Sequence, residues 1–227
     1  MKNFKDYLTQ VSLIIVSLFI AFGAERCNQN MKDSRKLDTY LEAINEELEY
    51  ELKTCRMNLH DCKNDIQGLS TGIGVFSSRE DRKLPLGIGQ VMSVFVRGVF
   101  RSFSPTSYQL MAESGDALLM KDLDLRRELS SLAAFRNDYI KEDLLRHDEL
   151  TLKTMEVMGA YVDIACNRKS ESANFATCIS DQELLYQQGA SDLAVILRHS
   201  ETRAFHLQRY EERLQRVIPL VEAELDD

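Results

Sequence analysis

Histidine and cysteine are the residues of this chain best able to bind a metal or act as nucleophiles, and their spacing matches no known site. Among 227 residues there are four histidines and five cysteines. No histidine follows a glutamate by three positions, as in di-metal helix bundles. His199 and His206 are seven residues apart, about 10.5 Å along a helix, too far to share one metal ion. We therefore predict no metal, no cofactor and no enzyme activity.

The cysteines fall into three groups. Cys55 and Cys62 are seven residues apart on an apolar stripe, too far to bridge each other on one helix, and are expected to be small core residues. Cys166 and Cys178 flank a polar loop, where a disulfide would join two helix ends and stabilise the fold by roughly 3 kcal/mol. That bond requires an oxidising compartment, and two free thiols are the alternative. Cys27 either bridges a second copy or stays free.

An apolar segment near the N-terminus predicts where the chain resides. The run from Val11 to Ala24 has no charged residue, and the uncharged stretch begins at Tyr7. A helix over residues 7–24 would be about 27 Å long, enough to cross a bilayer core. We predict a short tail over residues 1–6 and a transmembrane helix over residues 7–24, in contact with membrane lipid.

Two alternatives compete with a membrane anchor. Lys2 and Lys5 followed by the apolar run and by Ala21-Phe22-Gly23 also fit a cleavable signal peptide. A buried helix of a soluble core is the other alternative. The anchor is favoured because helix-compatible sequence continues beyond the run, with no proline until Pro85.

The orientation in the membrane follows from charge and length. The Lys/Arg count slightly favours a cytoplasmic C-terminal domain, whereas a short N-terminus with an early apolar run is typical of a signal-anchor. We expect a single-pass protein with a cytoplasmic N-terminus and an exported C-terminal domain, which in a bacterium means the inner membrane and the periplasm.

A stripe of apolar residues at steps of three and four follows the apolar segment. It predicts a long, coiled-coil-like amphipathic helix over residues 25–69. Such a helix must bury its stripe against other helices of the chain or against a second copy. The candidate oligomer seam comprises Leu37, Leu41, Ile44, Leu48, Leu52 and Leu59.

The remaining sequence predicts a loop and then a helical bundle. Glycines mark a loop over residues 70–89, and residues 90–227 form the bundle domain that packs with the long helix. Residues 91–103 are apolar and β-branched, consistent with a helix or a strand, and we expect a helix. Ser180 and Glu183 form a capping box that starts a helix, which Gly189 interrupts or ends.

Composition sets the fold class. The chain has only 3 prolines and 10 glycines, which disfavours an all-β fold with its frequent turns. Its net charge is −8 and it has no extended Lys/Arg tract, which disfavours nucleic acid as a partner. We predict an all-α protein.

Two segments resemble an uncharacterised family of bacterial single-pass membrane proteins. They are residues 35–41 (RKLDTYL), with Leu48 further on, and residues 106–122 (TSYQLMAESGDALLMKD), followed by Leu125-Arg126. The resemblance implies an N-terminal anchor and a helical domain, and it implies no activity.

The expected function is a membrane-anchored helical interaction or scaffold module that binds a protein partner or forms a homo-oligomer. The alternative is an exported sensory domain that binds a small ligand between helices and signals through a partner chain. A closed pocket with convergent polar groups would favour sensing, and an exposed apolar patch on the long helix would favour protein contact.

Overall fold

The computed structural model describes residues 2–78, 107–163, 166 and 178–226, with side chains from residue 12 onward. In this part of the chain the regular structure is helical, with one isolated antiparallel bridge between Val162 and Ile179. The predicted all-α fold is therefore confirmed. The segment 91–103 lies outside the described residues.

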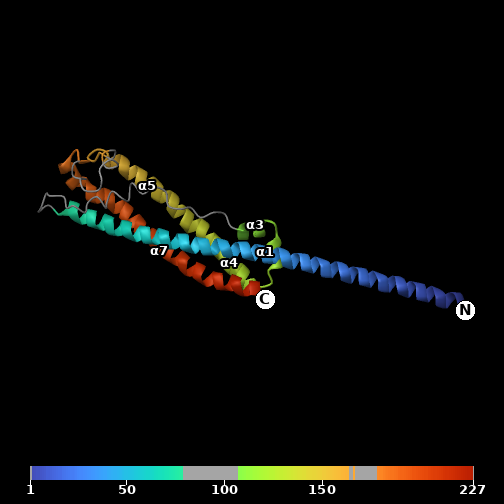
Figure 1. Ribbon diagram of the computed structural model, residues 1–227. Coiled ribbons are helices and arrows are strands. Elements are labelled where there is room, and N and C mark those ends of the chain that lie inside the picture. The colour runs from blue at the N-terminus through green and yellow to red at the C-terminus, as the bar shows by residue number, and fades with distance from the viewer. Residues whose placement is uncertain (1, 79–106, 164–165, 167–177, 227) are drawn as a thin grey trace.

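Two long helices form the frame of the bundle. They are α1, Lys2–Ser77, and α7, Gln182–Asp226. They lie side by side over the whole length of α7 (Figure 1). They are antiparallel, since Glu51 contacts Tyr210 whereas Cys62 contacts Ser200.

The apolar stripe of α1 is the reason for this packing. Leu41, Ile44 and Leu48 are each less than 5% exposed, and Leu37 and Leu52 are partly buried against the same core. They pack with Leu207, Leu214 and other buried residues of α7 and the shorter helices. Packing within one chain thus buries the stripe, which is the first of the two partners that the sequence left open, and the oligomer seam stays a prediction.

Shorter elements pack on these two helices. α3, Ser107–Glu113, packs on α1, and α4, Leu123–Phe135, packs on α7. Between them lies the 3-10 helix η2, Asp116–Leu119. The π-helical turn η3, Arg136–Lys141, joins α4 to α5, Glu142–Met158, which also packs on α7.

The helix ends show how the sequence sets these boundaries. α3 is followed by Gly115, whose φ of 80° suits glycine. The Asp122 carboxylate accepts hydrogen bonds from the amides of Asp124 and Leu125 and thereby caps α4. At the start of α7 the carboxylate of Asp181 accepts from the amide of Leu184, so Asp181, and not the predicted Ser180, makes the side-chain cap.

Part of α1 extends beyond the bundle (Figure 1). Its side chains from residue 12 to residue 32 are exposed, and the apolar ones form a continuous group. That group consists of Leu13, Ile14, Ile15, Val16, Leu18, Phe19, Ile20 and Phe22. Within the described residues, no helix has an apolar stretch long enough to span a membrane. The predicted span 7–24 begins with residues whose side chains lie outside the description.

Two predicted features of the helices are wrong. α1 begins at Lys2, within the short tail expected over residues 1–6, and it continues through residues 70–77, which we expected to be a loop. Leu69 and Phe76 are buried in an apolar cluster with Leu185 and Leu193 of α7. The free energy of this burial outweighs the low helix propensity of the glycines in residues 70–77. Likewise α7 continues through Gly189.

Gly189 allows the ends of α1 and α7 to approach closely. A Cβ atom at this position would lie 3.0 Å from Cδ2 of Phe76 and 3.1 Å from Cδ1 of Leu185. The glycine is thus explained by close packing of the two helices rather than by a break in α7. By contrast, a Cβ at Gly74 would meet nothing within 4 Å.

These two glycines make a matched test of the packing. We expect Gly189→Leu to destabilise the protein by about 1–3 kcal/mol through overpacking. We expect Gly74→Ala to stabilise it by about 0.5 kcal/mol through helix propensity. Thermal unfolding followed by circular dichroism measures both changes, and equal effects of the two variants would contradict the packing described here.

Candidate functional site

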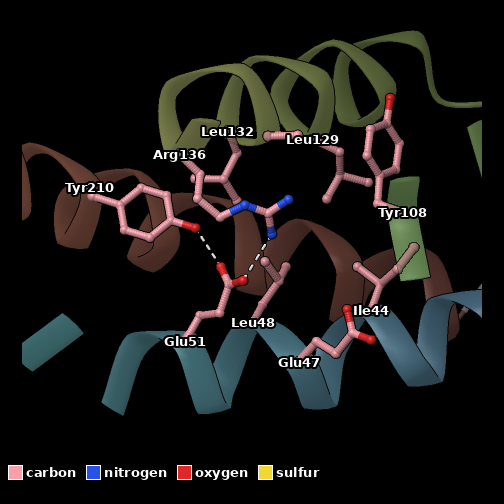
Figure 2. Close-up of a pocket in the computed structure, with 10 residues that line it drawn as sticks. Ile44, Glu47, Leu48, Glu51, Tyr108, Leu129, Leu132, Arg136 and Tyr210 are labelled. Atoms are coloured by element: carbon pink, nitrogen blue, oxygen red, sulfur yellow. Dashed lines mark hydrogen bonds and ion pairs between the residues drawn. The ribbon is translucent and has the colours of Figure 1, made fainter. Parts of the chain in front are cut away.

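A buried ion pair joins three elements in the middle of the bundle. Arg136 of η3 donates from Nη1 to Oε1 of Glu51 on α1, at 2.9 Å. The hydroxyl of Tyr210 on α7 donates to the other carboxylate oxygen, Oε2 (Figure 2). Glu51 is 4% exposed and Arg136 is 5% exposed. Both oxygens of the carboxylate are therefore satisfied by partners from two other elements.

Burial governs the electrostatics of this cluster. Desolvation raises the pKa of Glu51, while the hydrogen bond from Tyr210 and the charge of Arg136 oppose that rise. The pKa of Tyr210 is raised by burial and by the carboxylate it contacts. The adjoining cavity, lined also by Tyr108 and Leu129, has a volume of about 10 Å³. Such a space holds one water molecule at most, so this cluster is structural rather than a ligand pocket.

A second polar layer lies further along α7, around Arg203. This arginine is 1% exposed, and burial lowers its pKa while Asp65 of α1 and Asp143 of α5 oppose that fall. Cys62 is also close, and its thiol donates to the carbonyl of Ser200 at 3.1 Å. The layer is therefore made by charges from α1, α5 and α7.

Three histidines complete the second layer. His206 Nδ1 lies 2.6 Å from the carboxylate of Asp143, and His199 Nε2 lies 3.2 Å from the carbonyl of Asp143. The rings of His147 and His199 stack at 5.9 Å. Burial, and then the charges of Arg203 and His199, lower the pKa of His147 to about 3. His199 and His206 thus bind the same aspartate, and the described residues form no group able to hold a metal ion.

An open groove lies on the surface between α4–η3 and α7. Its volume is about 470 Å³. Arg209 and Arg213 of α7 lie over aromatic rings, at 5.4 Å from Phe205 and 4.6 Å from Phe135. The residues that line it are Glu128, Ser131, Phe135, Tyr139, Phe205, His206, Arg209, Glu212, Arg213 and Arg216.

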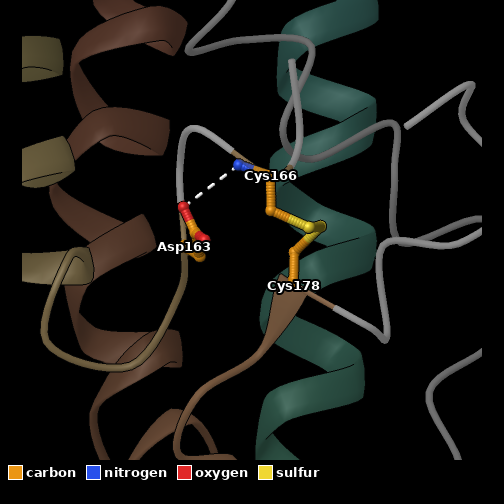
Figure 3. The surroundings of a disulfide bond; sticks show 3 residues. All are labelled: Asp163, Cys166 and Cys178. Atoms are coloured by element: carbon orange, nitrogen blue, oxygen red, sulfur yellow. Dashed lines mark hydrogen bonds between the residues drawn. A yellow bond between two sulfur atoms is a disulfide. The ribbon is translucent and has the colours of Figure 1, made fainter. Parts of the chain in front are cut away.

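The structure contains a disulfide between Cys166 and Cys178 (Figure 3). The backbone amide of Cys166 donates to Asp163 at 3.0 Å, and the bridge between Val162 and Ile179 lies next to the disulfide. The bond therefore links the segment after α5 to the segment before α7. This is the pairing that we expected for an oxidising compartment.

The other cysteines differ in exposure. Cys27 is exposed, whereas Cys55 and Cys62 are buried in the core, as the apolar stripe predicts. Burial raises the pKa of Cys55 to about 12 and that of Cys62 to about 11. A buried thiol that stays protonated is a poor nucleophile, so these two residues act in packing.

The sequence carries two signals beyond those from which the site was predicted. Residues 68–72 read Gly-Leu-Ser-Thr-Gly, which matches Gly-x-Ser-x-Gly, but this segment is inside α1 and Ser70 is exposed on a helix rather than held on a strand-to-helix turn. The buried charges could also have been found, because Glu51 is three residues after Leu48 and four before Cys55, at a core position. Tyr108 donates to the carbonyl of Arg126 at 3.2 Å and lines the small cavity.

Comparisons with known proteins give no match to a family model, a curated protein or a solved structure. The resemblance to the bacterial membrane family therefore stays a prediction.

The contribution of the buried ion pair to stability can be compared with that of an ion pair at the surface. We expect Arg136→Ala to destabilise the protein by about 3–5 kcal/mol, because it leaves a buried carboxylate without its cation. The matched control is Arg56→Ala, whose 2.8 Å pair with Glu211 is 55% exposed on the arginine side and should be worth at most about 1 kcal/mol. Urea unfolding measures both, and similar losses would contradict the structural role of the cluster.

His147 predicts a loss of stability in mild acid. Its pKa is about 3 in the folded protein against 6.5 as the ordinary value. Between these values the unfolded chain binds a proton that the folded chain does not, so stability falls as the pH drops from 6.5, by up to about 1.4 kcal/mol per unit.

The His147→Asn variant isolates this effect. It keeps Glu51, whose raised pKa acts in the opposite direction. Unfolding free energies at pH 7, 5 and 4 should fall less steeply for the variant than for the parent. Identical slopes would contradict a lowered pKa of His147 in the folded protein.

The disulfide is tested by mass analysis of unreduced protein. After thiol blocking under denaturing conditions, we expect label on Cys27, Cys55 and Cys62, and none on Cys166 or Cys178. Labelling of all five cysteines would contradict the presence of the disulfide.

Proposed function

We propose that the chain is a membrane-tethered helical interaction module whose bundle is held away from the bilayer by α1. The observation that carries the proposal is the continuity of α1, which joins an exposed apolar segment to a buried core within one helix. A partner protein would then be bound by the bundle, and the role is non-catalytic.

The apolar segment supports insertion because it is apolar on every face. Leu13, Ile14, Ile15 and Val16 are consecutive and each about half exposed or more. A helix that is apolar all round is typical of a membrane or of a core, and the bundle supplies no cover here. Each such side chain left in water costs about 1.5–3 kcal/mol relative to burial. We propose that residues 7–24 insert as the anchor.

The length of α1 between the proposed anchor and the buried stripe sets the distance from the membrane to the bundle. Leu41 is the first fully buried residue of the stripe, and Lys36 pairs with Asp116 at 2.7 Å nearby. From Ala24 to Leu41 the helix rises about 25 Å. The charged residues in between, such as Arg26 and Lys32, suit the headgroup region and the water beyond.

The disulfide supports an exported bundle. Disulfides persist in compartments such as the periplasm and are rare in the cytosol. We therefore propose a cytoplasmic N-terminus and a periplasmic bundle at the inner membrane. The groove favours the second candidate function, an exported sensory domain with a small ligand.

Membrane fractionation tests the anchor. We expect the full chain to stay in the membrane pellet after alkaline carbonate extraction. A double variant, Val16→Arg with Phe19→Arg, should move it to the supernatant. The matched control is Leu118→Arg with Leu152→Arg, two exposed leucines of the bundle, which should stay in the pellet.

A full chain with an uncut N-terminus in the aqueous extract would contradict the proposal. Mass determination of the N-terminus distinguishes an anchor from a cleaved signal peptide. Protease access from each side of the membrane then fixes the orientation, and we expect digestion of the bundle from the periplasmic side.

A further inference from the structure

We propose that the groove between α4–η3 and α7 binds a small planar anion, a compound with an aromatic ring next to a carboxylate or phosphate group. This inference does not rest on the proposed membrane tether, because the groove is built entirely within the bundle.

Three arginines give the groove its charge. Arg209, Arg213 and Arg216 are at positions i, i+4 and i+7 of α7, so they share one face over about 10.5 Å. Like charges at this spacing repel one another, and an anion relieves that repulsion. The chain as a whole has a net charge of −8, so a cluster of cations here opposes the overall sign.

Aromatic rings form the floor of the groove. Phe135 and Tyr139 lie 4.8 Å apart, and Tyr139 and His206 lie 5.0 Å apart, measured between ring centroids. Tyr139 is 45% exposed and Phe205 is 56% exposed, so each ring keeps part of its surface open to the groove. Their exposed faces offer a planar ligand a stacking surface.

The arginines are oriented by these rings. Arg209 lies over Phe205, and Arg213 lies over Phe135 while donating from Nη1 to the hydroxyl of Ser131 at 2.9 Å. A guanidinium stacked on a ring presents its N–H edge outward, which suits a carboxylate or phosphate. A volume of about 470 Å³ is in the range of small-molecule sites.

Two carboxylates of the groove oppose the binding of an anion. Glu212 lies 3.6 Å from Arg209 and is 47% exposed, so it competes with an anion for this arginine. Glu128 lines the groove from α4. An anion must therefore displace the weak pair of Glu212, and removing this charge should improve binding.

The test uses phenyl phosphate and benzoate as probes on the full chain in an uncharged maltoside detergent. Ligand-observed saturation-transfer NMR measures binding, with inorganic phosphate as a competitor that lacks the ring and benzyl alcohol as a probe that lacks the charge. We call inorganic phosphate and benzyl alcohol the half-probes, because each carries only one of the two groups. We expect saturable binding of at least one aromatic anion, with an affinity at least tenfold tighter than that of either half-probe. Preference between the two anions distinguishes phosphate from carboxylate ligands.

Variants assign the binding to the groove. Arg209→Gln with Arg216→Gln should weaken binding at least tenfold, and Glu212→Gln should strengthen it severalfold. The matched control, Arg198→Gln, changes an exposed arginine on the same face of α7, about 16 Å from Arg209, and should leave binding unchanged. Circular dichroism checks the fold, and Tyr139→Ala removes an exposed ring if the arginine variant does not fold.

Three results would overturn the proposal. One is the absence of saturable binding by either aromatic anion. Another is equal affinity for an aromatic anion and a half-probe. The third is binding that the groove variants leave unchanged.

Discussion

The antiparallel packing of α1 on α7 is the interaction on which the rest of the structure depends. The shorter helices pack mainly on one or other of these two, and both polar layers lie between them. Apolar burial supplies the free energy, and it is non-directional. The buried charges supply what apolar contact does not, because Glu51 must meet Arg136 and Tyr210 together. A shift of register along α1 would leave a charge buried without its partners, which is costly.

The π-helical turn is part of the same constraint. In η3, Arg136 and Ile140 are buried whereas Tyr139 is exposed toward the groove. The segment η3 thus supplies both the cation of the buried ion pair and an aromatic ring of the groove. Phe135, just before it, stacks on Tyr210 at 6.2 Å. π-helical turns occur frequently at functional sites, which agrees with a groove in this place.

The sequence predicted what periodicity determines. The all-α fold and the apolar stripe from Leu37 follow from local patterns. The stripe could not say whether its partner was α7 or a second copy, because burial looks the same in both cases. Gly189 was misread because a glycine at a close helix contact has the same local signal as a glycine that ends a helix. The groove joins residues 128–139 to residues 205–216, and no local pattern predicts that they meet.

The central claim is that α1 continues unbroken from the end of the apolar segment into the core, and a distance measurement over this part of the helix tests it most directly. Cys27 is exposed, whereas Cys55 and Cys62 are buried with raised pKa values, so a spin label on Cys27 and one on a Lys63→Cys variant would be selective. An unbroken helix places the two backbone positions about 54 Å apart. Double electron–electron resonance in lipid nanodiscs should give one narrow distribution near this distance. A broad distribution, or one centred at a much shorter distance, would contradict the claim.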